Sequence, residues 1–120
     1  MATVLVVDDS VSLRSMVTFT LTKQGYDVVE AEDGEDAFNK AKHIVCDLVL
    51  TDVNMPKMDG ISLCTELRKL ESFKFTPILI LTTENSQEMK YKGKAAGATG
   101  WLVKPFNPET LLSTLKRVVR

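Results

Sequence analysis

The sequence predicts a single α/β domain in which five parallel strands alternate with five helices in a doubly wound sheet. Five short runs of aliphatic and β-branched residues are spread along the chain, and the segments between them carry apolar residues at helical spacing. Because two parallel strands need a crossover connection, this (βα)5 alternation calls for a parallel sheet with helices on both faces. At 120 residues the chain has the length of one domain, and we expect residues 1–120 to fold as one unit.

The expected strands are too short to be helices and too uniformly apolar to be half-exposed, so we expect them to be buried on both faces. They are Val4–Val7, Val28–Ala31, Leu48–Leu50, Ile78–Leu81 and Trp101–Val103.

The expected helices follow from apolar spacing and from their end signals. They run from Leu13 to a stop at Gly25, from Gly34 to His43, from Leu63 to Leu70 after Gly60, from Ser86 to Ala96, and from Pro108 to Val119. Gly25 is a natural helix stop, and Pro108 suits a first helical turn. The segment 86–96 is polar and lysine-rich, so it has the weakest helical signal.

The composition excludes several kinds of partner. The sequence is 44% hydrophobic and 26% charged with a formal net charge of −1, so it lacks the basic excess typical of binding to nucleic acid or a membrane surface. Cys46 and Cys64 are too few for a disulfide scaffold and lack the spacing of a zinc site. No signal peptide and no apolar run long enough to span a membrane is present. We therefore expect a cytoplasmic monomer that binds neither nucleic acid nor membranes.

Polar residues follow the strands where a parallel sheet places its ligand site. Asp8 and Asp9 follow the first strand, Asp52 follows the third, Thr82 ends the fourth and Lys104 follows the fifth. Ligands bind outside the carboxyl ends of the strands in open parallel sheets. If strands one, three, four and five are neighbours, these side chains share one crevice.

Three carboxylates in one crevice repel one another, since two unit charges about 4 Å apart interact by about 4 kcal/mol at an effective dielectric constant near 20. Lys104 supplies one positive charge, and Mg²⁺ would supply the rest, because it prefers oxygen ligands. No histidine or cysteine occupies these positions, which argues against zinc or copper. A carboxylate beside Mg²⁺ and a lysine is a plausible nucleophile toward phosphorus, with Lys104 and Thr82 holding the phosphoryl oxygens.

Five motifs, in order and across essentially the whole chain, resemble the receiver domain of two-component response regulators. They are Val6-Val7-Asp8-Asp9-Ser10, Leu50-Thr51-Asp52-Val53-Asn54-Met55-Pro56, Met58-Asp59-Gly60, Leu81-Thr82-Thr83 and Val103-Lys104-Pro105-Phe106. The resemblance is greatest to stand-alone chemotaxis regulators of the CheY type, because nothing remains for an output domain. It implies a flavodoxin-like fold with strand order 2-1-3-4-5.

The resemblance also implies roles for the acidic residues. Asp52 would be the phosphoacceptor. Asp9, Asp52 and the backbone carbonyl of Asn54 would ligate Mg²⁺, and Asp8 would act mainly through water. Asn54 and Glu84 occupy positions that tune dephosphorylation in the family.

The remaining implied roles concern the switch. Thr82 would bind the new phosphoryl group, Lys104 would pair with it, and the Lys104–Pro105 peptide is expected to be cis. Thr82 and Trp101 would form the switch, in which Trp101 stands where tyrosine is usual. Such a protein is not an enzyme in the ordinary sense, because it catalyses only its own phosphotransfer and dephosphorylation.

The resemblance implies a histidine kinase as phosphodonor, most simply a chemotaxis kinase, and it leaves the output open. Lys90 lies where the motor-docking face usually presents an apolar side chain, and residues 85–87 lack the basic residues expected there. One output is binding to the flagellar motor switch protein, with a phosphatase as a further partner. The other is a non-motor role as a phosphoryl sink or a phosphorelay intermediate.

Other function classes fit the residues less well. A flavodoxin-like cofactor-binding protein shares the architecture, but two acids in its phosphate-binding loop would repel the cofactor. A haloacid-dehalogenase-type phosphatase needs an Asp-x-Asp pair after the first strand, which Val7-Asp8-Asp9-Ser10 does not supply. A P-loop nucleotide hydrolase is excluded because its Gly-Lys-Ser/Thr signature is missing.

Overall fold

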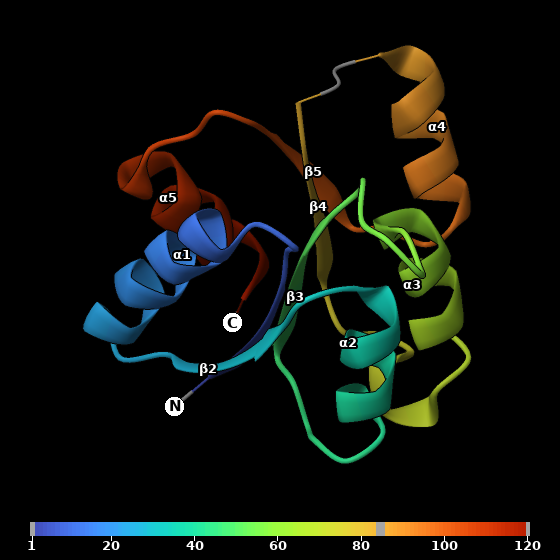
Figure 1. Cartoon of the computed structure of the whole chain (residues 1–120), viewed down its shortest axis with the longest axis horizontal. Helices are drawn as coiled ribbons and strands as arrows, with labels where there is room; N and C mark the ends of the chain where they lie inside the picture. The colour runs from blue at the N-terminus through green and yellow to red at the C-terminus, as the bar shows by residue number, and fades with distance from the viewer. Residues whose placement is uncertain (1, 84–85, 120) are drawn as a thin grey trace.

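The computed structural model describes residues 2–83 and 86–119, and its centre is one parallel sheet of five strands in the order β2-β1-β3-β4-β5 (Figure 1). The strands are β1 (Thr3–Val7), β2 (Asp27–Ala31), β3 (Leu48–Asp52), β4 (Ile78–Thr82) and β5 (Gly100–Val103). This confirms the predicted fold class and the predicted strand order.

Helices cover both faces of the sheet (Figure 1). The helices are α1 (Val11–Lys23), α2 (Gly34–Ala41), α3 (Gly60–Leu67), α4 (Gln87–Ala95) and α5 (Pro108–Val118), with a short 3₁₀ helix η1 (Glu71–Phe73) after α3. Helices α1 and α5 lie on one face, and α2, α3 and α4 lie on the other. All five predicted helices are present, although α3 ends before Leu70 and the chain turns through η1 instead.

Two hydrophobic cores result from the alternation of side chains along the strands. In β1, Val4 and Val6 point to the core shared with α1 and α5, whereas Leu5 and Val7 point to the core shared with α2 and α3. All four side chains are essentially inaccessible to solvent. Both faces of the central strands are therefore apolar, which is why these strands read as continuous apolar runs.

The prediction that every strand is buried on both faces is wrong for the two edge strands. In β2 only Ala31 is buried, and in β5 only Leu102 is buried. An edge strand has a neighbour on one side only, so part of its surface stays open to solvent. In β2 the open positions carry Asp27 and Glu30, and charges of this kind protect an edge from pairing with another chain.

Strands β3 and β4 are longer at their carboxyl ends than the apolar runs predicted. The pairing of β3 with β4 continues through Thr51 with Ile80 and Asp52 with Leu81. A backbone ladder does not depend on side-chain polarity, so Asp52 and Thr82 are the last residues of their strands. Across the described residues, no helix is both long enough and apolar enough to span a bilayer.

Candidate functional site

The predicted acidic crevice is present at the carboxyl edge of the sheet. Asp8, Asp9 and Asp52 each place a carboxylate oxygen within 4.8 Å of the others. The Lys104 ammonium lies 3.3 Å from Asp8 Oδ2 and 3.2 Å from Asp52 Oδ1. These four residues meet because β1, β3 and β5 all end on this edge of the sheet, and Asp8, Asp9, Asp52 and Lys104 lie at or just after those ends.

Asp8 is the most tightly held member of the cluster. Its side chain is 2% exposed, and Oδ1 accepts a hydrogen bond of 2.8 Å from the Ser10 backbone N–H while Oδ2 faces Lys104. The hydroxyl of Ser10 accepts from Leu13 N and so caps α1. Asp9 lies between these residues and is exposed. The turn after β1 thus offers one buried and one exposed carboxylate.

Asp52 lies at the centre of the crevice. Its Oδ1 accepts a 2.8 Å hydrogen bond from the Val53 backbone N–H as well as the Lys104 contact. Burial raises the pKa of Asp52; the Lys104 ammonium opposes this rise, whereas the Asp8 carboxylate adds to it. Burial and repulsion together outweigh the one lysine in setting the pKa of Asp52, so a further positive charge nearby would favour its ionised form.

Two glycines allow the loop after β3 to pack closely, Gly60 against the end of β3 and Gly34 at the start of α2. A Cβ on Gly60 would collide with the Asp52 carbonyl oxygen, and a Cβ on Gly34 would collide with the Met58 carbonyl oxygen. Lys57, in the same loop, has a φ of 69°, and the Met58 N–H donates to Pro56 O across it at 2.8 Å, which describes a γ-turn. Gly34 and Lys57 were not expected to shape the site, whereas Met58 and Gly60 belong to a motif quoted for the family resemblance.

The other sequence-predicted site residues surround this cluster. Thr82 is buried at the end of β4, and its carbonyl oxygen accepts a 2.7 Å hydrogen bond from Lys104 N. The Lys104–Pro105 peptide is cis, as predicted. Asn54 lies in the loop after β3 with an exposed side chain. Glu84, the second predicted tuning residue, lies outside the described residues.

Trp101 lies on β5, paired with Ile80. Its ring packs against α4 at Gly93, where a Cβ would come within 3.1 Å of Cζ3. The indole Nε1 is buried and has no hydrogen-bond partner within the described part of the chain. On the α4 side, Trp101 lines a hollow of about 350 Å³ together with Lys90 and Lys94. The surface beside Trp101 is therefore basic.

The donor set fits Mg²⁺ and does not fit a softer metal. All three side chains of the cluster offer carboxylate oxygens, which are hard ligands, and no sulfur or imidazole lies among them. Among the described residues, the three carboxylates have one ammonium, that of Lys104, paired with two of them. The excess of negative charge and the oxygen ligands together match a small divalent cation.

Comparison with known proteins gives the same result over nearly the whole chain. Residues 4–116 match the family model described as the response regulator receiver domain. The crystal structure of the chemotaxis protein CheY4 of Vibrio cholerae is 57% identical, covers 99% of both chains and superposes with a TM-score of 0.97. The chemotaxis protein CheY1 of Helicobacter pylori is 38% identical over 117 residues, which are 96% of this chain and 94% of that protein.

A further solved structure bears on the metal. The receiver domain of the sensor histidine kinase PA1611 of Pseudomonas aeruginosa is 30% identical, covers 98% of this chain and 96% of that chain, and has a TM-score of 0.90; its structure holds a magnesium ion in the active-site cleft. The chain spans about half the length of the transcriptional regulators among its curated relatives. Fold, crevice and family model agree, and the chain belongs to the response regulator receiver domain family.

Proposed function

We propose that the protein, as a single receiver unit over residues 1–120, accepts a phosphoryl group on Asp52 from the phosphohistidine of a kinase in the cytoplasm. The observation that carries this proposal is the meeting of Asp8, Asp9 and Asp52 with Lys104. A nucleophile toward phosphorus needs an oxygen with a lone pair and nearby cations to neutralise the phosphoryl oxygens. In this crevice Asp52 supplies the nucleophilic oxygen, and Lys104 supplies part of the positive charge.

In this mechanism Asp52 Oδ1 stays bound to Val53 N–H and Oδ2 attacks phosphorus. The new O–P bond forms while the P–N bond to the donor imidazole breaks, and its electron pair returns to the imidazole nitrogen. Lys104 already lies 3.2 Å from Asp52 and can follow the charge onto the phosphoryl oxygens. Thr82 binds another of these oxygens, and its movement would change the packing around Trp101.

Asp9, Asp52 and the backbone carbonyl of Asn54 would hold Mg²⁺, with Asp8 acting mainly through water. Mg²⁺ supplies neutralisation of negative charge on the phosphoryl oxygens. The magnesium ion in the related PA1611 receiver domain supports this assignment. Asn54 and Glu84 would set the rate at which water removes the phosphoryl group, and this self-dephosphorylation is the protein's own contribution to catalysis.

For the output, we propose a phosphorylation-dependent change in protein binding in chemotaxis, which the similarity to CheY4 and CheY1 supports. The candidate partners are a chemotaxis kinase, the flagellar motor switch protein and a phosphatase. A second output, as a phosphoryl sink or phosphorelay intermediate, is favoured by one observation. The hollow beside Trp101 is lined by Lys90 and Lys94, whereas the resemblance to chemotaxis regulators implies an apolar side chain at position 90.

The phosphoacceptor assignment is tested with acetyl phosphate and Mg²⁺, read by intact-protein mass spectrometry. Wild type should gain the mass of one phosphate, and Asp52→Asn should not. Asp59→Asn is the matched control, because Asp59 is a nearby acid that caps α3 and lies outside the cluster. A mass gain of one phosphate that persists in Asp52→Asn would contradict the assignment.

The two outputs are separated by binding to peptides from the motor switch protein. If the protein binds the flagellar motor switch, its peptides should bind more tightly with beryllofluoride and Mg²⁺, which mimic the phosphoryl group, than without them. Equal peptide binding in both states, together with rapid transfer of phosphoryl groups from the kinase, would favour the role as a phosphoryl sink or phosphorelay intermediate. Asp52→Asn serves as the control that cannot be activated.

A further inference from the structure

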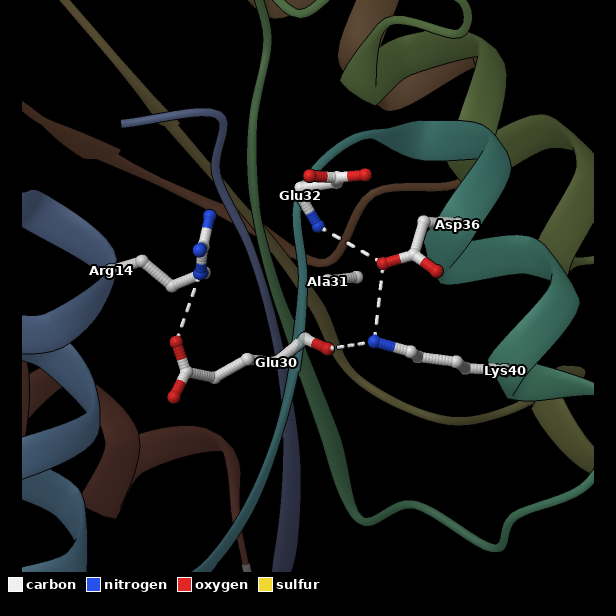
Figure 2. A pocket seen from close by; sticks show the side chains of 6 residues that line it. All are labelled: Arg14, Glu30, Ala31, Glu32, Asp36 and Lys40. Carbon is white, nitrogen blue, oxygen red and sulfur yellow. Dashed lines mark hydrogen bonds and ion pairs between the residues drawn. The ribbon is translucent and has the colours of Figure 1, made fainter. Parts of the chain in front are cut away.

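Arg14 links the acidic turn to the neighbouring edge strand. From the first half of α1 its Nη1 donates a 2.6 Å hydrogen bond to the Asp8 carbonyl oxygen, and its Nε donates to Glu30 Oε1 on β2 at 2.9 Å. Figure 2 shows this pair on one side of a hollow of about 370 Å³. The Arg14 side chain is 17% exposed and its contact with the Asp8 carbonyl is partly buried, whereas the Glu30 side chain is 42% exposed, so solvent screens the Glu30 contact more.

The Asp8 carbonyl belongs to the peptide group that joins Asp8 to Asp9. This group is planar, so fixing its oxygen constrains the directions in which the two flanking residues leave it. The other polar atoms of Asp8 already have partners: its N–H donates to Ala31 O, and its carboxylate is held by Ser10 and Lys104. Arg14 completes this set with a charge-assisted bond, the stronger kind of hydrogen bond.

The two contacts of Arg14 need a guanidinium. Its planar fork presents several N–H donors in fixed directions, so one side chain binds the Asp8 carbonyl and the Glu30 carboxylate together. A lysine ammonium is a point charge on a flexible stem and does not hold two acceptors in one fixed plane. The Glu30 carboxylate in turn keeps the fork in its orientation.

Lys40 provides the internal comparison. It lines the same hollow from α2, donates to the Glu30 carbonyl oxygen at 2.6 Å and pairs with Asp36 at 3.1 Å (Figure 2). Its contacts tie α2 to β2, and none of those described reaches the turn after β1. Arg14 and Lys40 are thus two cations at one hollow, of which only Arg14 contacts the acidic turn.

We propose that Arg14, held by Glu30, is a positioning residue for the magnesium site, because it fixes the Asp8–Asp9 peptide and with it the two carboxylates of the turn. This rests on the proposed function, in which Asp9 ligates Mg²⁺ and Asp8 acts mainly through water. Removing groups that orient metal ligands typically weakens metal binding about 10–100-fold. Loss of Arg14 therefore weakens Mg²⁺ binding while the fold persists.

The test is calorimetric titration of the full chain with MgCl₂, with the free energy of unfolding measured alongside. Arg14→Gln and Arg14→Lys should both weaken Mg²⁺ binding about tenfold or more, whereas Lys40→Gln should leave it unchanged. Wild-type affinity in either Arg14 variant, or an equal loss in Lys40→Gln, would overturn the positioning role. If neither Arg14 variant folds, Glu30→Ala takes their place, and unchanged affinity there would overturn it too.

A metal-free readout separates this inference from the proposed function. The Ser10 amide donates to Asp8 Oδ1, so its hydrogen exchange reports the order of the turn. In EDTA, exchange at Ser10 should be faster in Arg14→Gln than in wild type and unchanged in Lys40→Gln. Equal exchange in wild type and Arg14→Gln would overturn the inference. Failure of wild type to bind Mg²⁺ would instead refute the proposed function, whatever the exchange shows.

Discussion

Neutralising Asp52 should stabilise the metal-free protein. The perturbation is Asp52→Asn, which keeps an oxygen acceptor for Val53 N–H and for Lys104 but removes the charge. Ionised Asp52 is drawn to Lys104 and repelled by Asp8 and Asp9. The balance of these interactions sets the sign of the effect.

The magnitude follows from the distances. At an effective dielectric constant near 20, the contact of 3.2 Å with Lys104 contributes about 5 kcal/mol of attraction. Each carboxylate oxygen within 4.8 Å contributes at least ~3.5 kcal/mol of repulsion, so Asp8 and Asp9 together outweigh the lysine by about 2 kcal/mol. Solvent around the exposed Asp9 reduces this sum. We therefore expect Asp52→Asn to raise the free energy of unfolding by about 1–2 kcal/mol at neutral pH without metal.

The pH dependence has a definite sign. Because the pKa of Asp52 is raised in the folded state, its ionisation destabilises the fold as the pH rises above the ordinary aspartate value of 3.8. The advantage of Asp52→Asn should therefore be absent below that value, grow as the pH rises through the native pKa, and stay constant above it. Saturating Mg²⁺ should shrink or reverse it, because the metal stabilises wild type more.

The assay is urea unfolding at several pH values, in EDTA and in Mg²⁺, with Asp59→Asn as the control. Asp59 lies outside the cluster, and asparagine caps a helix as well as aspartate does, so we expect a change within about 0.5 kcal/mol. An Asp52→Asn protein that is no more stable than wild type in EDTA at neutral pH would refute the reasoning from charge balance.

Three further predictions concern the backbone around the site and the switch. Gly60→Ala should cost about 1–3 kcal/mol and slow phosphoryl uptake from acetyl phosphate, because its Cβ meets the Asp52 carbonyl; unchanged stability and rate would contradict this. Lys57→Gly should raise the free energy of unfolding by about 0.5–1 kcal/mol, since a φ of 69° strains a side-chain-bearing residue; a lower urea midpoint would count against that strain. Gly93→Ala should change the emission of Trp101, the only tryptophan in the sequence, because the new methyl group must displace the ring; an unchanged spectrum would show that the ring has room to spare.

The sheet and the crevice were predictable because both depend on patterns that the sequence carries directly. Apolar runs marked the strands. The rule that ligands bind at the carboxyl ends predicted that Asp8, Asp9, Asp52 and Lys104 share a crevice if strands one, three, four and five are neighbours, and the structure brings them together. The strand order came from the family resemblance. The exposure of β2 was missed, because an edge strand and a central strand differ in their neighbours rather than in their own composition.

The contacts that side chains and glycines make with backbone carbonyl groups around the site were not predictable in the same way. Arg14 binds a backbone carbonyl, and every residue has one, so no residue type marks the acceptor. The approach of Gly60 to the Asp52 carbonyl likewise involves backbone atoms alone. In the sequence these contacts are represented by one glycine and one arginine, and either residue type occurs in many other structural settings, so neither indicates such a contact.

The charge balance at Asp52 also explains why stability and function are coupled at this site. A nucleophilic carboxylate must be ionised, yet burial and the Asp8 carboxylate raise the pKa of Asp52. A fully neutralised crevice would be more stable but would have little affinity left for a further cation. Among the described residues, Lys104 is the cation that pairs with the Asp8 and Asp52 carboxylates, so one ammonium faces three acids there. The free energy that destabilises the metal-free fold then becomes available for binding Mg²⁺. If this coupling is correct, variants of the cluster that stabilise the protein in EDTA should bind Mg²⁺ more weakly, in the same order.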